Sequence, residues 1–194
     1  MALLQKYVDD TPPTEDDYFA WEQSAPGRWE YVQGEIRAMA GGTVNHALVG
    51  ADNVRVLGNA LIPKGCQVFG SDLKAHTGDG VNTFPDVAVV CGERQYYQGR
   101  QDVITNPVLL VEVLSPSTEA YDRGEKFAHY QTIPTLTNDL LVSPDEPRVT
   151  LHTRMNGLWQ SAEVAGLDQN VRVASLGIDI ALSDIYALLT FDTA

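Results

Sequence analysis

Basic side chains are scarce in this sequence. Its 194 residues include 13 Lys and Arg against 26 Asp and Glu, which gives a formal net charge of −13. Proteins that bind nucleic acid draw much of their affinity from Lys and Arg contacts to phosphates. The charge therefore excludes a protein that wraps nucleic acid nonspecifically. Nucleic acid could bind only where basic side chains gather on one face, or where carboxylates hold divalent cations.

Cysteine is also rare. Cys66 and Cys91 are the two cysteines of the chain, and no C-x-x-C motif or His/Cys cluster accompanies them. This excludes a disulfide framework and a zinc site of the usual spacing. We expect both thiols to be reduced and half-buried, without a redox role.

Long apolar runs are missing. No run reaches the roughly 18 residues that span a bilayer, and the first ten residues lack the basic end and apolar stretch of a secretory signal. We therefore expect a cytoplasmic protein with no membrane partner.

The composition that remains is that of a globular domain, with 44% hydrophobic and 20% charged residues. A chain of this length suits one domain better than two. We predict a single domain over residues 1–194, in which residues 1–13 form a loose N-terminal arm that ends at Thr11-Pro12-Pro13.

Local patterns predict the order of the elements. Thr14 precedes three acidic residues and favours a helix start, Gln33-Gly34 favours a hairpin turn, and apolar residues from Val44 to Leu61 follow a helical spacing. Strand-like runs follow around Cys66–Phe69 and Leu73–His76. Shorter outer strands and a helical turn near Leu182–Leu189 close the chain.

Two later runs are almost wholly apolar. These are V-A-V-V-C after Asp86 and V-L-L-V-E-V-L around Glu112, the pattern of strands buried on both faces. A helix over 119–131 and a strand from Asn138 follow, which implies a right-handed parallel crossover. We predict an α/β (α+β) fold in which one mixed sheet, with helices on both faces, holds all the strands.

Carboxylates interrupt both apolar runs. Asp86 follows Pro85 at the start of one strand and Glu112 lies inside the other. A carboxylate in such a place must be neutralised, paired or bound to a cation. If the two strands are neighbours, the pair makes an oxygen-rich site suited to Mg²⁺ or Mn²⁺. Each residue also has an ordinary reading, Asp86 as a cap and Glu112 as an ion-pair partner.

The helix after Glu112 supplies a cation. Asp122, Lys126 and Tyr130 recur every four residues and so share one face. If that face packs on the sheet, the Lys126 ammonium can reach the carboxylates, orient or deprotonate water and stabilise charge on a phosphoryl oxygen. Alternatively, Lys126 is a solvated charge paired with Asp122. On the catalytic interpretation we expect Lys126→Ala to leave folding nearly unchanged.

These segments resemble a known family. The Pro-Asp strand start, followed by V-E-V-L-S-P-S-T-E-A-Y-D-R-G-E-K-F-A-H-Y, is similar to the signature of the Uma-two family, a restriction-endonuclease-like branch of the PD-(D/E)xK nucleases. The likeness extends to W-E-Y-V-Q-G-E-I, to N-H in the first long helix and to S-D-L-K. It runs from about Glu15 to the C-terminal helix.

The resemblance implies a restriction-endonuclease-like core of helix, three strands, helix and strand. It makes Asp86 and Glu112 metal ligands, adds the backbone carbonyl of Val113, and gives Lys126 the role of the lysine that assists the attacking water. In the wider superfamily that lysine lies two positions after the glutamate, where this chain has Leu114. A further departure is Asn138-Asp139, where the family tends to carry an aromatic residue.

Two more residues are candidates. Glu35 matches the family's first acidic position, although it could equally be an ordinary surface residue of the hairpin. His46 opens a helix after Gly41-Gly42, where it could touch phosphate or water, and a structural hydrogen-bonded histidine is the alternative.

The leading hypothesis is therefore a metal-dependent endonuclease that hydrolyses DNA with Mg²⁺ or Mn²⁺. A homodimer is expected, because cutting both strands needs two active sites and the family's relatives tend to pair. Two alternatives stay open. One is a catalytically silent nuclease fold that serves binding or assembly, and the other is a hydrolase of a small nucleotide-like phosphodiester.

Overall fold

The computed structural model describes residues 12–39 and 41–191. The predicted arm over residues 1–13 thus falls almost wholly outside the described residues. Within them, no helix has the length and apolar character needed to cross a membrane.

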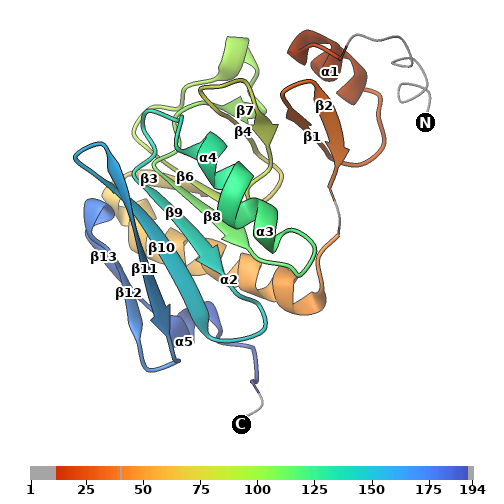
Figure 1. Ribbon diagram of the computed structural model, residues 1–194. Helices are drawn as coiled ribbons and strands as arrows, with labels where there is room; N and C mark the ends of the chain where they lie inside the picture. Colours follow the sequence, from red (N-terminus) through yellow and green to blue (C-terminus); the bar gives the residue numbers. More distant parts are fainter. Residues whose placement is uncertain (1–11, 40, 192–194) are drawn as a thin grey trace.

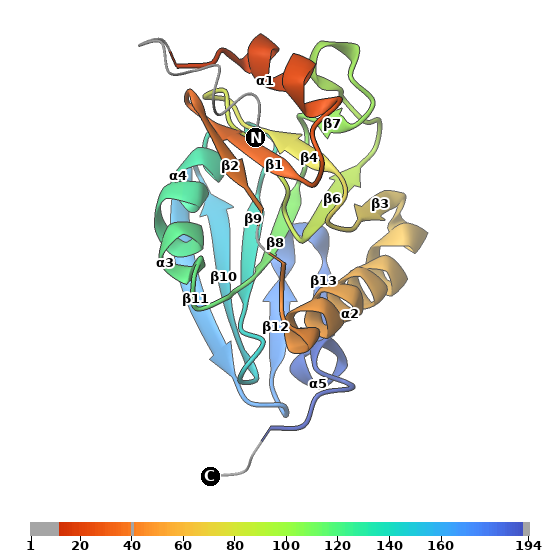
Figure 2. The same cartoon turned by 90° about the vertical axis from the view of Figure 1, so that its right-hand side faces the viewer.

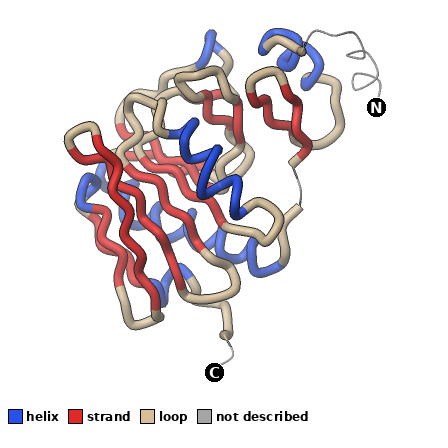
Figure 3. Tube along the Cα trace, viewed as in Figure 1, coloured by secondary structure: helices blue, strands red, loops and turns tan. Residues whose placement is uncertain are grey.

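A six-stranded mixed sheet forms the centre of the protein (Figures 1 and 3). Its strand order is β11-β10-β9-β8-β6-β3. The neighbours β8 and β9 run parallel and the other pairs run antiparallel. In chain order the strands are β3 (Cys66–Phe69), β6 (Val87–Cys91), β8 (Leu109–Val113), β9 (Asn138–Val142), β10 (Arg148–Met155) and β11 (Leu158–Ala165).

Helices cover both faces of this sheet (Figure 2). The long helix α2 (Val44–Leu61) and the short α5 (Leu182–Ile185) lie on one face. The opposite face carries one continuous helix over 119–130, made of α3 (Glu119–Tyr121), a π-helical segment η4 (Asp122–Lys126) and α4 (Phe127–Tyr130). Side chains of each central strand point alternately to the two faces of the sheet. In β8, Leu109 and Val111 pack in the cluster under α2, and Leu110 packs in the cluster that contains Tyr130.

The predicted core order is confirmed. Helix α2 is followed by β3, β6 and β8, then by the 119–130 helix and β9. Because β8 and β9 are parallel neighbours, that helix is a crossover connection. The unusual Asn138-Asp139 pair does not disturb the strand, since β9 begins at Asn138 and the Asn138 amide donates to the Thr153 hydroxyl at 2.9 Å.

The prediction that one sheet holds every strand is wrong. A second sheet has the order β2-β1-β5-β4-β7, and β12 and β13 form a separate two-stranded sheet. The short strands β4 (Lys74–His76), β5 (Asn82–Thr83) and β7 (Val103–Ile104) are insertions before and after β6 in the chain. Because β6 and β8 are already paired on both edges, these strands pair with one another and with the N-terminal hairpin of β1 (Trp29–Val32) and β2 (Glu35–Ala38). The last two strands are β12 (Asn170–Val173) and β13 (Ile178–Ala181).

Local chemistry explains the N-terminal elements. Helix α1 (Glu15–Glu22) begins with a capping box in which Thr14 and Asp17 satisfy each other's backbone N–H groups. The β1–β2 hairpin turns through Gln33 and Gly34, which both have positive φ, as a two-residue hairpin requires. Short 3-10 turns complete the connections: η2 (Ile62–Lys64), η3 (Tyr97–Gly99) and η5 (Ala174–Leu176).

The expectation of two reduced cysteines is also wrong. Cys66 and Cys91 form a disulfide. They lie directly opposite each other in the antiparallel β3–β6 pair, with Cα atoms 4.0 Å apart. No local pattern predicts this bond, because the register that places Cys66 opposite Cys91 is a tertiary property.

Candidate active site

Asp86 and Glu112 come from neighbouring strands. Strands β6 and β8 are antiparallel with Val87 opposite Val111 and Ala88 opposite Leu110. Continued by one residue, this register places Asp86 opposite Glu112 on the face that packs against the 119–130 helix. Residues directly opposite in such a pair have Cβ atoms about 4.5–5.5 Å apart. The predicted adjacency of the two strands is therefore confirmed, and the two carboxylates share one face.

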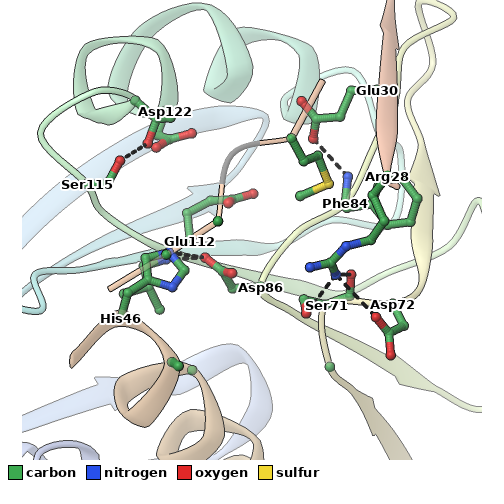
Figure 4. Close-up of a pocket in the computed structure, with 18 of the residues that line it drawn as sticks. Arg28, Glu30, His46, Ser71, Asp72, Phe84, Asp86, Glu112, Ser115 and Asp122 are labelled. Atoms are coloured by element: carbon green, nitrogen blue, oxygen red, sulfur yellow. Dashed lines mark hydrogen bonds and ion pairs between the residues drawn. The ribbon is translucent and has the colours of Figure 1, made fainter. Parts of the chain in front are cut away.

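Both carboxylates line a pocket of about 580 Å³ (Figure 4). Its walls come from the β1–β2 hairpin, the start of α2, the ends of β6 and β8 and the 119–130 helix. The ionisable side chains of the pocket that matter for binding or catalysis are those of Arg28, Glu30, His46, Asp86, Glu112, Asp122 and Lys126.

The π-helical segment sets the positions of two of these residues. Asp122 begins η4 and Lys126 ends it, and both side chains are buried. A π-turn adds one residue to the helical repeat, and such segments occur often at functional sites. The sequence predicted the helix and its inward face, but not the widened turn.

Lys126 lies among carboxylates. Its Nζ is 2.9 Å from Oε1 of Glu112, 3.7 Å from Oε1 of Glu30 and 3.8 Å from Oδ1 of Asp122. Burial by itself lowers the pKa of the Lys126 ammonium, but the negative field of the carboxylates of Glu112, Glu30 and Asp122 outweighs burial and raises that pKa well above its ordinary value. Lys126 is therefore a protonated cation over the whole physiological range. The reading of Lys126 as a solvated helix charge is excluded, because only 7% of its side chain is exposed.

Hydrogen bonds hold the two acids from several sides. Asp86 Oδ2 accepts the backbone N–H of Val113 at 2.7 Å, and Glu112 Oε1 also accepts the Tyr130 hydroxyl. These hydrogen bonds hold Asp86 and Glu112 in position in the absence of a ligand. Burial raises the pKa of the neighbouring Asp122 carboxyl, and the positive charge of Lys126 opposes this rise.

Glu30 is the hairpin acid that reaches the pocket. Its Oε1 accepts the Phe84 N–H at 2.9 Å and the Thr83 hydroxyl, and it is 8% exposed. Glu35 is exposed, pairs with Arg37 at 2.8 Å and does not line the pocket. It sits next to the hairpin turn on the edge strand β2, about 7 Å further along the hairpin than Glu30. The structure thus does not bring Glu35 into the site.

His46 stands at the other wall. Thr43 caps α2 and accepts the His46 N–H, and His46 Nε2 lies 3.5 Å from Asp86 Oδ2. Gly42 packs so closely on the His46 ring that an added Cβ would come within 2.6 Å of it. A residue without a side chain is thus favoured at position 42, and the His46 ring faces Asp86. Contact of His46 with phosphate or water stays a prediction.

The carboxylates of the pocket suit a hard divalent cation that needs few ligands from the protein. No group of three or more His, Cys, Asp or Glu side chains arranged to hold a metal occurs in the described part of the chain. Asp86 and Glu112 provide two carboxylates at an open pocket, and Mg²⁺ characteristically takes one or two carboxylates and completes its shell with water and substrate phosphates. Val113 lines the same pocket. Its carbonyl as a third ligand stays a prediction.

Sequence reasoning undervalued two residues. It treated Glu30 as structural and used Asp122 only to define a helix face, yet both line the pocket beside Lys126. A signal existed for Glu30, an acid within an otherwise apolar W-E-Y-V strand.

Comparison with known proteins decides the family. The family described as "Uma2: Putative restriction endonuclease" matches residues 15–183. This chain belongs to the Uma2 family. The matched region contains Glu30, Asp86, Glu112 and Lys126. The resemblance identified from the sequence is thereby confirmed.

Relatives of this Uma2 chain are known by sequence and by structure. Synechocystis slr1290 is 38% identical over 91% of this chain and 92% of its own length, and sll1609 is 30% identical over 85% and 94%. Both are described as uncharacterized proteins. A crystal structure of "a putative nuclease belonging to DUF820" from Anabaena variabilis has a TM-score of 0.74 at 20% identity, and covers 91% of this chain and 98% of that one. Its likeness confirms the restriction-endonuclease-like fold.

Proposed function

We propose that this Uma2 protein is a metal-dependent endonuclease that hydrolyses DNA phosphodiester bonds. One observation carries the proposal. Asp86 and Glu112 lie on one face at an open pocket, and a buried ammonium, Lys126 Nζ, lies 2.9 Å from Glu112. Two carboxylates and a lysine in this order are also what the family resemblance implies for a nuclease. The match to a family described as "Putative restriction endonuclease" supports the same reaction class.

Asp86 and Glu112 would hold Mg²⁺ or Mn²⁺, which when bound supplies an activated water and neutralises charge on the phosphate. The Val113 N–H donates to Asp86 Oδ2 at 2.7 Å and holds this carboxyl group in place for the task.

Lys126 acts as a fixed cation in this scheme. Because its pKa is raised, the ammonium does not take a proton from water. It orients the nucleophile and stabilises negative charge on a phosphoryl oxygen by hydrogen bonding. Tyr130 holds Glu112 through its hydroxyl, and His46 at 3.5 Å from Asp86 is placed to hydrogen-bond a substrate oxygen.

The test is cleavage of plasmid and branched DNA by the purified protein with Mg²⁺, Mn²⁺ or EDTA. We expect cutting that needs the metal and is lost in Asp86→Ala. The control Asp179→Ala removes an exposed acid on β13 that does not line the pocket. We also expect calorimetry to show Mn²⁺ binding that Asp86→Ala abolishes. Absence of cutting together with absence of Mn²⁺ binding would favour a silent assembly module. Cutting confined to a nucleotide-like phosphodiester would favour the small-substrate hydrolase.

We further propose that the protein acts as a homodimer. Strand β11 is an edge of the central sheet, and none of its eight residues is buried. Unpaired strand edges are ready partners for another strand. Its single acid, Glu163, is paired with Arg148 of the same chain, so two copies can approach along β11 despite the net charge. Antiparallel pairing of two β11 strands would be symmetric, as a two-fold dimer requires.

A further inference from the structure

Positive charge at the pocket is confined to two fixed cations. Among its lining residues only Arg28 and Lys126 are Lys or Arg, whereas Glu30, Asp86, Glu112 and Asp122 are acids. Lys126 is buried and already shared among three carboxylates. A phosphate that approaches from solvent therefore meets one accessible cation, Arg28.

Arg28 is held at the rim by one end of its guanidinium. Its Nη1 donates to the Ser71 carbonyl at 2.7 Å and to the Ser71 hydroxyl at 3.1 Å, and lies 3.2 Å from Asp72 Oδ1. Within the described residues, Nε and Nη2 of Arg28 have no partner. Figure 4 shows the guanidinium extending from the hairpin side into the pocket. The arrangement fixes the group while it leaves two donors free.

The ion pair with Asp72 does not neutralise this site. The Asp72 side chain is 99% exposed and that of Arg28 is 44% exposed, so their attraction is screened by water. A phosphate can take its place, because a guanidinium offers a planar pair of N–H donors that matches two phosphate oxygens. The bond to the Ser71 carbonyl would keep Arg28 in position during the exchange.

We propose that Arg28 binds a backbone phosphate of the nucleic-acid strand, next to the phosphate that is cut. The inference rests on the proposed function and assigns Arg28 a substrate-binding role. In an acidic chain one placed arginine then directs the strand to the pocket that holds Asp86 and Glu112. Arg28 contributes to binding through its charge, so the contact should release a counterion.

The test measures affinity for a fluorescent 20-base-pair duplex by anisotropy at several salt concentrations, with Ca²⁺ in place of Mg²⁺ to prevent cutting. We expect Arg28→Ala to weaken binding about 10-fold at low salt, as loss of a charged hydrogen bond does. We also expect the slope of log affinity against log salt to become shallower by about 1. Arg28→Lys should keep the slope and recover part of the affinity.

The matched control is Arg172→Ala, which removes an exposed arginine of β12 that does not line the pocket. It should retain the parental slope. A merely structural role for Arg28, as a tie to Ser71, would lower thermal stability without changing the slope, and that result overturns the inference. If the parent protein itself binds neither duplex nor single strand, the proposed function fails and this inference fails with it. Parental binding with an unchanged slope in Arg28→Ala rejects Arg28 alone.

Discussion

At the scale of single residues, the burial of Lys126 changes what its removal should do. The sequence suggested a helix-surface residue whose truncation is almost free, but the side chain is 7% exposed and pairs with Glu112. Breaking one partner of a buried pair typically costs about 3–5 kcal/mol, because the other charge stays buried alone. We therefore expect Lys126→Ala to lower the free energy of unfolding by about 3 kcal/mol in urea titrations, and to lower DNA cleavage on the order of 100-fold or more.

The neutral double variant Glu112→Gln/Lys126→Met separates the two effects. It removes the Glu112 charge together with the ammonium, but Glu30 and Asp122 still lose their cation, so part of the stability should return while cleavage stays absent. A Lys126→Ala protein with parental stability and parental cleavage would contradict both the ion pair and the catalytic assignment.

Asp139 provides a second prediction at this scale. It is buried in β9, both of its carboxylate oxygens lack a hydrogen-bond partner among the described residues, and burial raises its pKa from 3.8 to about 8. The folded protein then keeps a proton that the unfolded chain releases. Stability from this group is therefore present below about pH 4 and is lost as pH rises toward 8.

The variant Asp139→Asn removes this titration. We expect its advantage in unfolding free energy over the parent to grow between pH 4 and pH 8, by up to about 1.4 kcal/mol for each pH unit. Urea titrations of both proteins across that range measure the difference. A difference that stays constant with pH would show that Asp139 is ionised in the folded state.

Local sequence patterns predict part of the candidate site. Asp86 and Glu112 are acids in otherwise apolar strands, and Lys126 lies on the same helix face as Asp122 because the two are four residues apart. The resemblance favours Glu35, which matches the family's first acidic position, whereas the docking of the hairpin against Thr83 and Phe84 brings Glu30 to the pocket.

At the scale of elements, the π-helical segment makes a test of its own. Deleting Gly124 removes one residue from η4, which turns Lys126 by about 100° relative to Asp122. We expect the deletion variant to keep its far-ultraviolet circular dichroism and to lose cleavage by at least about 100-fold.

Gly124→Ala is the matched control for the deletion. Position 124 is exposed and an added Cβ would meet no atom within 4 Å. Alanine should therefore stabilise the helix by about 0.5–1 kcal/mol and leave cleavage intact. Cleavage by the deletion variant at the parental rate would mean that the widened turn does not position the site.

The disulfide gives a second test at the element scale. It joins β3 to β6 and closes a segment of 25 residues. A closure of this length stabilises by roughly 3 kcal/mol, since it restricts the unfolded chain. We expect Cys66→Ala/Cys91→Ala to lower the unfolding free energy by about 2–4 kcal/mol and to respond no further to reductant, whereas the parent loses the same amount when reduced. Equal stability of the parent with and without reductant would contradict a disulfide in solution.

At the scale of the whole molecule, the prediction concerns the dimer. Ala162 is exposed near the middle of β11, and antiparallel self-pairing would place the two copies' residues 162 close together. Ala162→Lys should therefore convert a dimer into a monomer without altering the fold, which light scattering with size-exclusion chromatography measures. Asn170→Lys, at an exposed position of β12, which pairs with β13, is the control. A monomeric parent, or a dimer insensitive to Ala162→Lys, rejects the β11 interface.

The sequence by itself determined the elements, the parallel crossover and the pairing of Asp86 with Glu112 on adjacent strands. These follow from local rules: caps, turn residues, side-chain alternation and the short connections between successive elements. Tertiary structure alone decided the split into three sheets, the Cys66–Cys91 bond, the choice of Glu30 over Glu35 and the exposure of Arg28 at the pocket. Each of these depends on register or docking between segments far apart in the chain. Packing across the whole fold sets such contacts, and local sequence patterns therefore do not predict them.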